Sequence, residues 1–266
     1  MISFNFKNKN VFISAASKGI GFEIAKVFSF FGANIVITSS SQKNLKIAKK
    51  KILEKNKNAK IVIIAYDQKK NLLPKNILSL LKKNSISSID ILINNSGGPP
   101  VKSILNIKNK DLDNALNANL KSAILTSQLF LPGMIKKKWG RIINLTSLTA
   151  KEPGANFALS NITRAGVVSF SKTLSQEVAK YGVTVNSILT GGVLTDRLKS
   201  LLTKLNKKNK KDFTKQLSKI SKLVPNGYIA NPNEFIQMIL FLATSNASYV
   251  NGSAITVDGG SSKSLF

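Results

Sequence analysis

The first residues that suggest chemistry form a glycine-containing turn at 14–21 (SAASKGIG), after a short apolar run and before a helical pattern. Glycines at such a junction let backbone N–H groups approach a pyrophosphate at the N-terminus of the helix, where the helix dipole favours negative charge. A plain strand–helix turn can have the same glycines. The position of the turn 14–21 directly after the first strand of the chain favours a nucleotide site.

The residue types exclude several classes of reaction. The 266 residues include no His and no Cys, which rules out a Ser-His-Asp triad, a thiolate nucleophile, a disulfide and a zinc site built on these ligands. The 12 acidic residues are scattered, and we predict no metal site. Acid–base chemistry must therefore use Tyr, Lys, Asp, Glu, a hydroxyl group or the substrate itself.

A net charge of +28 allows two interpretations. One is a basic groove that binds nucleic acid. The other is compositional, because Lys, Asn and Ile are abundant, as expected of a chain encoded by AT-rich DNA. Lys43, Lys46, Lys49 and Lys50 fall on solvent-facing helical positions, and neither they nor the run 207–211 alternates with aromatic residues. We favour the compositional interpretation and expect no specific nucleic-acid partner.

Short apolar runs alternate with amphipathic, helix-length segments along the whole chain. The pattern predicts strands at 10–14, 33–38, 61–65, 89–93, 141–146, 183–189 and 254–257. Helices are expected up to about residue 31 and at 42–57, 72–83, 112–136, 157–181, 194–222 and 232–244, with a kink or break at Pro132. This order predicts a single-domain α/β Rossmann fold over 1–266, a doubly wound, seven-stranded parallel sheet with helices on both faces.

Two further expectations concern the lid and the location of the protein. The segment 194–222 is very basic and less apolar, which suggests a helical substrate lid rather than a second domain. No stretch has the length of a signal peptide core or a membrane span, so we expect a cytoplasmic protein with no membrane partner.

More motifs follow the turn in a fixed order: INNSG at 93–97, NSILTG at 186–191, VPNG at 224–227 and VDGG at 257–260. Together they resemble the short-chain dehydrogenase/reductase family over nearly the whole chain, and in particular its divergent members similar to 3-oxoacyl-[acyl-carrier-protein] reductases. Ala15 stands where the family's turn has its first Gly, and its Cβ is expected to narrow the phosphate pocket. Thr190 replaces the family's Pro.

The resemblance also implies a set of cofactor contacts. They are Ser14, Ala16, Ser17, Lys18, Gly19, Ile20 and Gly21 in the turn, then Ser39, Ser40, Asp67 near the adenine, Asn94, Ser96, Gly97, Arg164, Gly191 and Thr195. The second strand ends in serines, without the carboxylate that would hold the ribose 2′-hydroxyl of NAD. Lys18 adds a cation in the turn. We expect NADP(H) to be favoured over NAD(H), although these serines can also cap the second helix.

The family's catalytic residues are an Asn, a Ser, a Tyr and a Lys. Asn119 and Ser147 match the first two, but Ser160 and Arg164 stand at the Tyr and Lys positions. A Ser hydroxyl is a much weaker acid than a phenol, and Arg does not deprotonate in proteins. Arg164 can still bind a ribose, a phosphate or an anionic substrate. The proton must then come from a substrate group, a water held by Ser147 and Asn119, or a lid lysine.

Three functions are compatible with these observations. The first is an NADP(H)-dependent oxidoreductase that acts on a small carbonyl or alcohol substrate. The second is a catalytically impaired nucleotide-binding homologue that acts as a sensor or as a partner in an oligomer. The third, a nucleic-acid-binding protein, rests on charge alone. Because members of the family are commonly dimers or tetramers, the resemblance implies a homo-oligomer.

Overall fold

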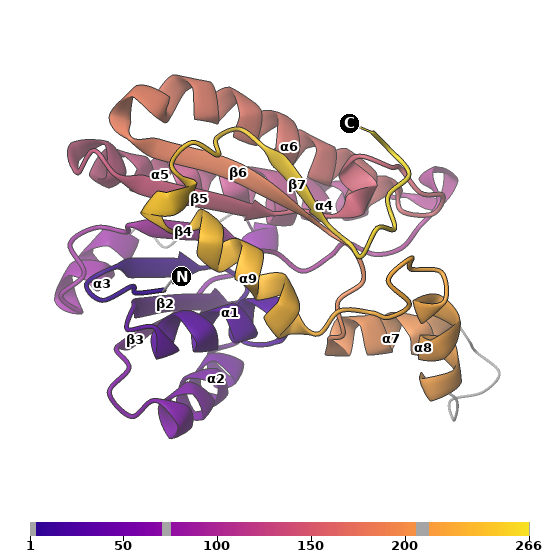
Figure 1. The fold of residues 1–266 in the computed structure, drawn as a ribbon, viewed down its shortest axis with the longest axis horizontal. Helices are drawn as coiled ribbons and strands as arrows, with labels where there is room; N and C mark the ends of the chain where they lie inside the picture. The colour runs from indigo at the N-terminus through magenta and orange to yellow at the C-terminus, as the bar shows by residue number, and fades with distance from the viewer. Residues whose placement is uncertain (1–3, 71–75, 206–212, 266) are drawn as a thin grey trace.

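The computed structural model describes residues 4–70, 76–205 and 213–265 (Figure 1). Seven parallel strands form one sheet in the order β3-β2-β1-β4-β5-β6-β7. They are β1 Asn10–Ile13, β2 Asn34–Ser39, β3 Ile61–Ala65, β4 Ile91–Asn94, β5 Gly140–Leu145, β6 Val183–Thr190 and β7 Ala254–Val257. The predicted doubly wound, seven-stranded parallel sheet is confirmed, and no strand end differs from the prediction by more than two residues.

Alternating side chains of the strands pack into two separate cores, one on each face of the sheet. Val11 and Ile13 pack with α1 (Gly19–Phe30), α2 (Gln42–Lys55) and α9 (Pro232–Leu242). Phe12 packs on the opposite face, with α3 (Ile77–Lys83), α5 (Ser122–Lys136) and α6 (Ala158–Val178). Because both faces are covered, the strands are nearly continuous apolar runs, as parallel sheets require.

The long helix predicted at 112–136 begins earlier and contains an irregular segment. It consists of α4 (Asn109–Ala115), a π-helical segment (Leu116–Lys121) and α5. Pro132 does not end it, because α5 continues to Lys136 with Phe130 and Met134 buried on either side of the proline. Short 3₁₀ helices lie at Gln68–Lys70, Ile104–Asn106, Leu148–Ala150, Ala179–Tyr181 and Ser245–Ala247.

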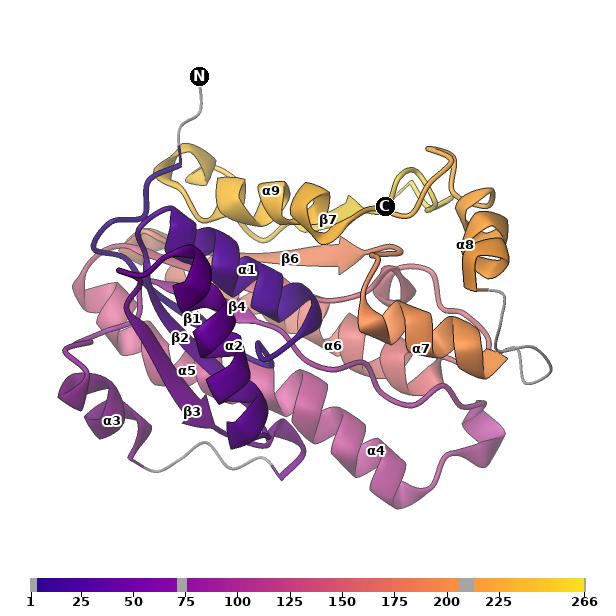
Figure 2. The same ribbon diagram turned by 90° about the horizontal axis from the view of Figure 1, so that it is seen from below.

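The segment expected to be a lid contains two described helices, α7 (Asp196–Leu205) and α8 (Phe213–Ser221). Figure 2 shows both beyond the carboxyl end of β6, to one side of the sheet. Residues 206–212, which include the lysine run at 207–211, lie outside the described residues, as does the start of the helix predicted at 72–83.

The strand order reverses between β1 and β4, which are neighbours in the sheet. From β1 the chain runs outward through β2 and β3, and from β4 it runs outward in the other direction to β7. Ligands of such sheets bind at the carboxyl ends of the strands beside this reversal. The turn after β1 therefore lies next to the segments that follow β4, β5 and β6. No helix of the described residues is long and apolar enough to cross a membrane.

Candidate active site

The glycine-containing turn lies at the carboxyl end of β1 and has a left-handed backbone at two positions, Ala15 (φ +48°) and Gly19 (φ +61°). A Cβ added at Gly19 would meet nothing within 4 Å. A Cβ at Gly21 would lie 2.7 Å from Asn95 Nδ2 and 2.8 Å from the Ala15 carbonyl oxygen. Gly21 therefore permits the close approach of α1 to the turn, while Gly19 keeps its outer side open. The left-handed conformation costs Ala15 about 1–2 kcal/mol.

Asn95 joins this turn to the end of β4. Its Nδ2 donates to the carbonyl oxygens of Ser14 (3.2 Å) and Ala15 (3.1 Å), and its backbone N–H donates to Ser14 Oγ (2.9 Å). Asn94 points the other way, because successive side chains of a strand face opposite sides. It is buried, and its amide donates to Asn144 Oδ1 (2.8 Å) and Ser127 Oγ (3.1 Å).

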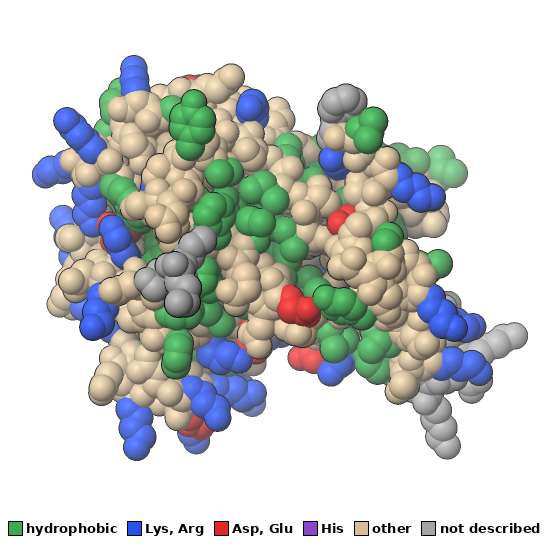
Figure 3. Space-filling view, in the orientation of Figure 1, with side chains coloured by type: hydrophobic (Ala, Val, Ile, Leu, Met, Phe, Trp, Pro, Cys, Tyr) green, Lys and Arg blue, Asp and Glu red, His purple; other side chains and the backbone are tan. Residues whose placement is uncertain are grey.

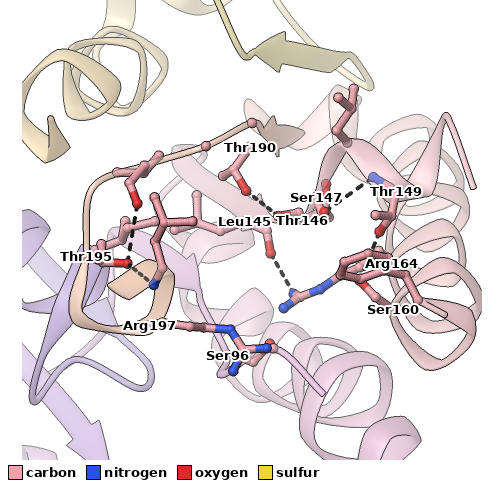
Figure 4. A pocket seen from close by; sticks show the side chains of 18 of the residues that line it. Ser96, Leu145, Thr146, Ser147, Thr149, Ser160, Arg164, Thr190, Thr195 and Arg197 are labelled. Atoms are coloured by element: carbon pink, nitrogen blue, oxygen red, sulfur yellow. Dashed lines mark hydrogen bonds between the residues drawn. The ribbon is translucent and has the colours of Figure 1, made fainter. Parts of the chain in front are cut away.

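A cavity of about 410 Å³ lies beyond the carboxyl ends of β4, β5 and β6, between α6 and α7 (Figure 4). Its lining comes from loops that topology brings together from distant parts of the chain. The lining residues are Ile20, Asn95, Ser96, Gly98, Pro99, Pro100, residues 145–149, Phe157, Ser160, Arg164, residues 190–193, Thr195, Arg197, Leu198 and Ser261.

Three hydroxyl groups lie along one wall of the cavity. Ser160 Oγ is 2.9 Å from Thr149 Oγ1, and either atom can be the donor. Ser147 Oγ accepts from the backbone N–H of Thr149 at 3.3 Å. Thr149, a residue that sequence reasoning missed, thus lies between the two predicted catalytic serines (Figure 4). The lining contains no Tyr among the described residues, and Phe157 is its one aromatic side chain.

Asn119 lies in the π-helical segment and is buried. Its Nδ2 donates to the Ala115 carbonyl at 3.0 Å, and its Oδ1 accepts from Ser96 Oγ at 2.8 Å. Asn119, Ser96 and Arg164 also line a separate cavity of about 10 Å³. This volume is the size that one water needs, and the lining is polar enough to hold one.

Arg164 extends from α6 into the cavity and is only 6% exposed. Its Nη1 donates to the Leu145 carbonyl at 2.9 Å, and its Nε has no hydrogen-bond partner among the described residues. Burial, with a smaller contribution from the charge of Arg197, lowers the pKa of Arg164 from its usual value to about 10. The guanidinium is therefore still charged at neutral pH.

A second hollow of about 270 Å³ adjoins the turn. Lys18 and Lys51 contribute cations to its lining, alongside the carboxylates of Glu23 and Asp196. Thr195 lines both this hollow and the main cavity, so the two are neighbours, and we call them together the groove.

The serines after β2 have more than one role. Ser17 Oγ donates to Ser39 Oγ at 2.9 Å, which connects the turn to the end of β2. Ser41 is the N-cap of α2, and its Oγ accepts from the Asn44 N–H at 3.2 Å. Ser40 is exposed.

Two residues after β6 fix the course of the next loop. Thr190 Oγ1 donates to the Thr146 carbonyl at 3.1 Å, which ties β6 to the end of β5. A Cβ added at Gly191 would lie 2.6 Å from the Cα of Asp258, so glycine is required for this close approach.

The structure brings some of the predicted residues to the groove and leaves others behind it. Ser17, Lys18, Gly19, Ile20, Ser96, Ser147, Ser160, Arg164, Gly191 and Thr195 line the main cavity or the hollow. Asn94 and Asn119 line only the cavity of one-water size, and Ser14, Ala16, Gly21, Ser39, Ser40, Asp67 and Gly97 line none of the three. Asp67 Oδ1 accepts from the Lys69 N–H at 3.1 Å. Asn95, Thr149 and Arg197 line the cavity without having been predicted.

Residues 14–262 match a family profile described as enoyl-(acyl carrier protein) reductase. The chain belongs to the short-chain dehydrogenase/reductase family. It is 31% identical over 259 residues to the 3-oxoacyl-[acyl-carrier-protein] reductase FabG of Rickettsia typhi, covering 96% of this chain and 98% of that protein. It is 29% identical over 257 residues to the NADPH-dependent reductase BacG of Bacillus subtilis, covering 97% and 99%.

Among solved structures, L-sorbose reductase from Gluconobacter frateurii, complexed with NADPH and L-sorbose, matches with a TM-score of 0.91 and 29% identity, covering 99% of this chain and all of that one. At the positions predicted for the family's Tyr–Lys pair, the chain has Ser160 and Arg164. Ser160 faces Thr149 on the cavity wall, and Arg164 reaches past it to the end of β5. The two side chains share one face of α6, four residues apart.

Proposed function

We propose that this chain is an NADP(H)-dependent oxidoreductase that moves a hydride between the cofactor and a small carbonyl or alcohol substrate. The observation that carries the proposal is that the hollow at the glycine-containing turn and the cavity that contains Ser147 are neighbours, both with polar groups in their lining. BacG, named as NADPH-dependent, and L-sorbose reductase, solved with NADPH, are similar to this chain over nearly its whole length.

The turn fits the cofactor's phosphates. Gly19 leaves its outer side open, Gly21 keeps α1 close, and Asn95 binds the Ser14 and Ala15 carbonyls and so fixes the backbone of the turn. The N-terminus of α1 adds a favourable dipole for an anion. Arg164 Nε, a buried donor with no described partner, offers a hydrogen bond to a ribose hydroxyl. NADPH supplies the hydride when bound.

The end of β2 supports the preference for NADP(H). Ser39 and Ser40 stand where a carboxylate would repel a 2′-phosphate, and Lys18 contributes a cation on the near side of the hollow. The Ser39 hydroxyl is already oriented by Ser17. These groups favour a bound phosphate monoester over a free ribose hydroxyl.

The cavity residues position the substrate and its proton. The Ser147 hydroxyl can donate to the substrate oxygen, while the Thr149–Ser160 pair completes a polar wall. Because neither serine is an effective acid at neutral pH, the route we propose for the proton is a water in the small cavity bounded by Asn119, Ser96 and Arg164. A positioned proton donor contributes about 10²–10⁴-fold to the rate.

A second candidate function is a nucleotide-binding homologue without turnover, acting as a sensor or in an oligomer. The hydrogen bond between Ser160 and Thr149 favours it, because no phenol lies within the described cavity. This candidate predicts cofactor binding without cofactor oxidation.

Calorimetric titration with NADPH and with NADH tests both candidates at their common step. We expect NADPH to bind at least about tenfold more tightly, and Ser39→Asp to reverse the preference. Absence of binding by either cofactor would contradict both. Once binding is established, oxidation of NADPH across a panel of aldehydes, ketones and oxo acids separates them, since a sensor gives no turnover with any.

We also propose that the chain is a cytoplasmic homo-oligomer, a dimer or tetramer, with residues 194–222 as its substrate lid. β7 lies at the edge of the sheet, and apolar side chains gather over α9 and β7 in Figure 3. The lysine and arginine side chains on this face are spread around its rim, which supports neither a nucleic-acid groove nor a single basic stripe. Light scattering on the protein as it elutes from a sizing column measures the mass of the assembly. A monomer at micromolar concentration would contradict the proposed oligomer.

A further inference from the structure

Two guanidinium groups from different elements converge in the main cavity. Arg164 comes from α6 and Arg197 from α7, the first described helix of the lid segment. Arg197 is exposed as a whole residue but lines the cavity, where its Nη2 donates to the Pro99 carbonyl at 3.1 Å. Figure 4 shows the two heads directed toward the same part of the cavity, near Ser96.

Neither arginine meets a counter-charge there. The described residues that line the cavity include no Asp and no Glu. Burial lowers the pKa of both groups, and the charge of Arg197 further lowers that of Arg164. Two like charges at one cavity repel each other, and an anion bound between them would relieve that repulsion.

Both guanidinium groups keep N–H donors that no described residue uses, as an anion site requires. The described hydrogen bonds use only Nη1 of Arg164 and Nη2 of Arg197, so Arg164 keeps Nη2 for a further ligand even when its Nε binds the ribose. Guanidinium groups bind carboxylates and phosphates through parallel N–H bonds. A site between two such groups selects a planar, charged group over a neutral carbonyl.

We infer that the substrate carries a carboxylate, which binds between Arg164 and Arg197; this rests on the proposed oxidoreductase function. The phosphates of the cofactor have other partners, since the turn and Lys18 lie on the adjoining hollow. The cavity between the arginines instead adjoins Ser147 and Ser160, where the reacting carbon must lie. A carboxylate held by both arginines also links α7 to α6.

Acetoacetate and acetoacetamide provide a matched test, because they share a 3-oxo skeleton and differ in charge. Each is titrated by calorimetry into the protein saturated with NADP⁺. We expect acetoacetate to bind at least about tenfold more tightly. Arg197→Gln should weaken the binding of acetoacetate by about 10- to 100-fold and leave the affinities for acetoacetamide and NADPH unchanged. Lys219→Gln on α8 removes the same charge from an exposed position and should leave all three unchanged.

Three outcomes would overturn the inference: equal binding of the two probes, a loss in Arg197→Gln that falls on NADPH instead, or an equal loss in Lys219→Gln. The first shows that no carboxylate site exists, the second assigns Arg197 to the cofactor's phosphates, and the third reduces the effect to general attraction by a basic surface. If the wild-type protein binds no NADPH, the proposed function has failed. The same comparison on the protein alone then still decides whether the anion site exists.

Discussion

Substituting Gly21 should damage the cofactor site through backbone contact. In Gly21→Ala, the new Cβ would lie 2.7 Å from Asn95 Nδ2, 2.8 Å from the Ala15 carbonyl oxygen and 2.9 Å from the Ala16 Cα. Ordinary contacts begin at 3.4 Å, so the atoms must separate by about 0.5–0.7 Å. Two of these neighbours are backbone atoms of the turn and cannot rotate away. Overpacking of this kind costs about 1–3 kcal/mol.

The displacement falls on the atoms that shape the phosphate site. Asn95 must give up or lengthen its bonds to the Ser14 and Ala15 carbonyls, and the N–H groups of the turn shift with them. We expect the dissociation constant of NADPH to rise at least about tenfold, which corresponds to about 1.4 kcal/mol. Calorimetry measures the binding, and urea unfolding measures the stability.

Substitutions at two other glycines distinguish the effect of steric contact from that of backbone strain. Gly19 has open space around a Cβ but a φ of +61°, so Gly19→Ala should lose about 1 kcal/mol of stability without a clash. Gly97 has open space and no positive φ, and Gly97→Ala should keep its stability. The reasoning is refuted if Gly21→Ala matches Gly97→Ala in both stability and NADPH affinity.

Three further predictions concern the arginines and the altered catalytic pair. Arg141→Met should lose about 2–4 kcal/mol in urea unfolding, because the Thr244 and Gly182 carbonyls that it pairs would be left buried; unchanged stability would contradict this. Arg164→Met should instead gain about 1–2 kcal/mol in urea unfolding, by removing a buried charge; a loss of stability would contradict this. Ser160→Tyr with Arg164→Lys should raise NADPH-dependent reduction at least about 10²-fold; no gain would mean that the cavity does not place a phenol beside the substrate.

The sequence predicts the sheet and the groove well, because both depend on patterns that repeat. Apolar runs of strand length define β1 to β7, and the position of the turn after β1 places the site at the reversal of strand order. The effect of Pro132 on the helix is harder to predict, because it depends on whether packing on both sides of the proline holds the helix together. Phe130 and Met134 do so through tertiary contacts that have no local signature.

Within the site, the sequence could not separate residues that face the groove from those behind it. Asn94 and Asn95 are adjacent and chemically identical, and only the side of β4 that each faces assigns one to the core and the other to the cavity. Strand alternation could have excluded one of the two. Thr149 and Arg197 had no such signal. Whether Thr149 reaches the cavity depends on the course of the loop after β5. Whether Arg197 reaches it depends on how α7 lies beside the cavity.

Two features of the predicted site reduce the stability of the protein, and their presence favours an active site over a decayed one. Arg164 buries a charge with one donor left without a described partner, and Ala15 holds a left-handed backbone with a Cβ. Each reduces stability by an amount that a single substitution could recover. Violations of local preference persist mainly where function requires them. A binding site that had lost its role would be expected to lose such residues first, whereas here Arg164 still lines a cavity of about 410 Å³.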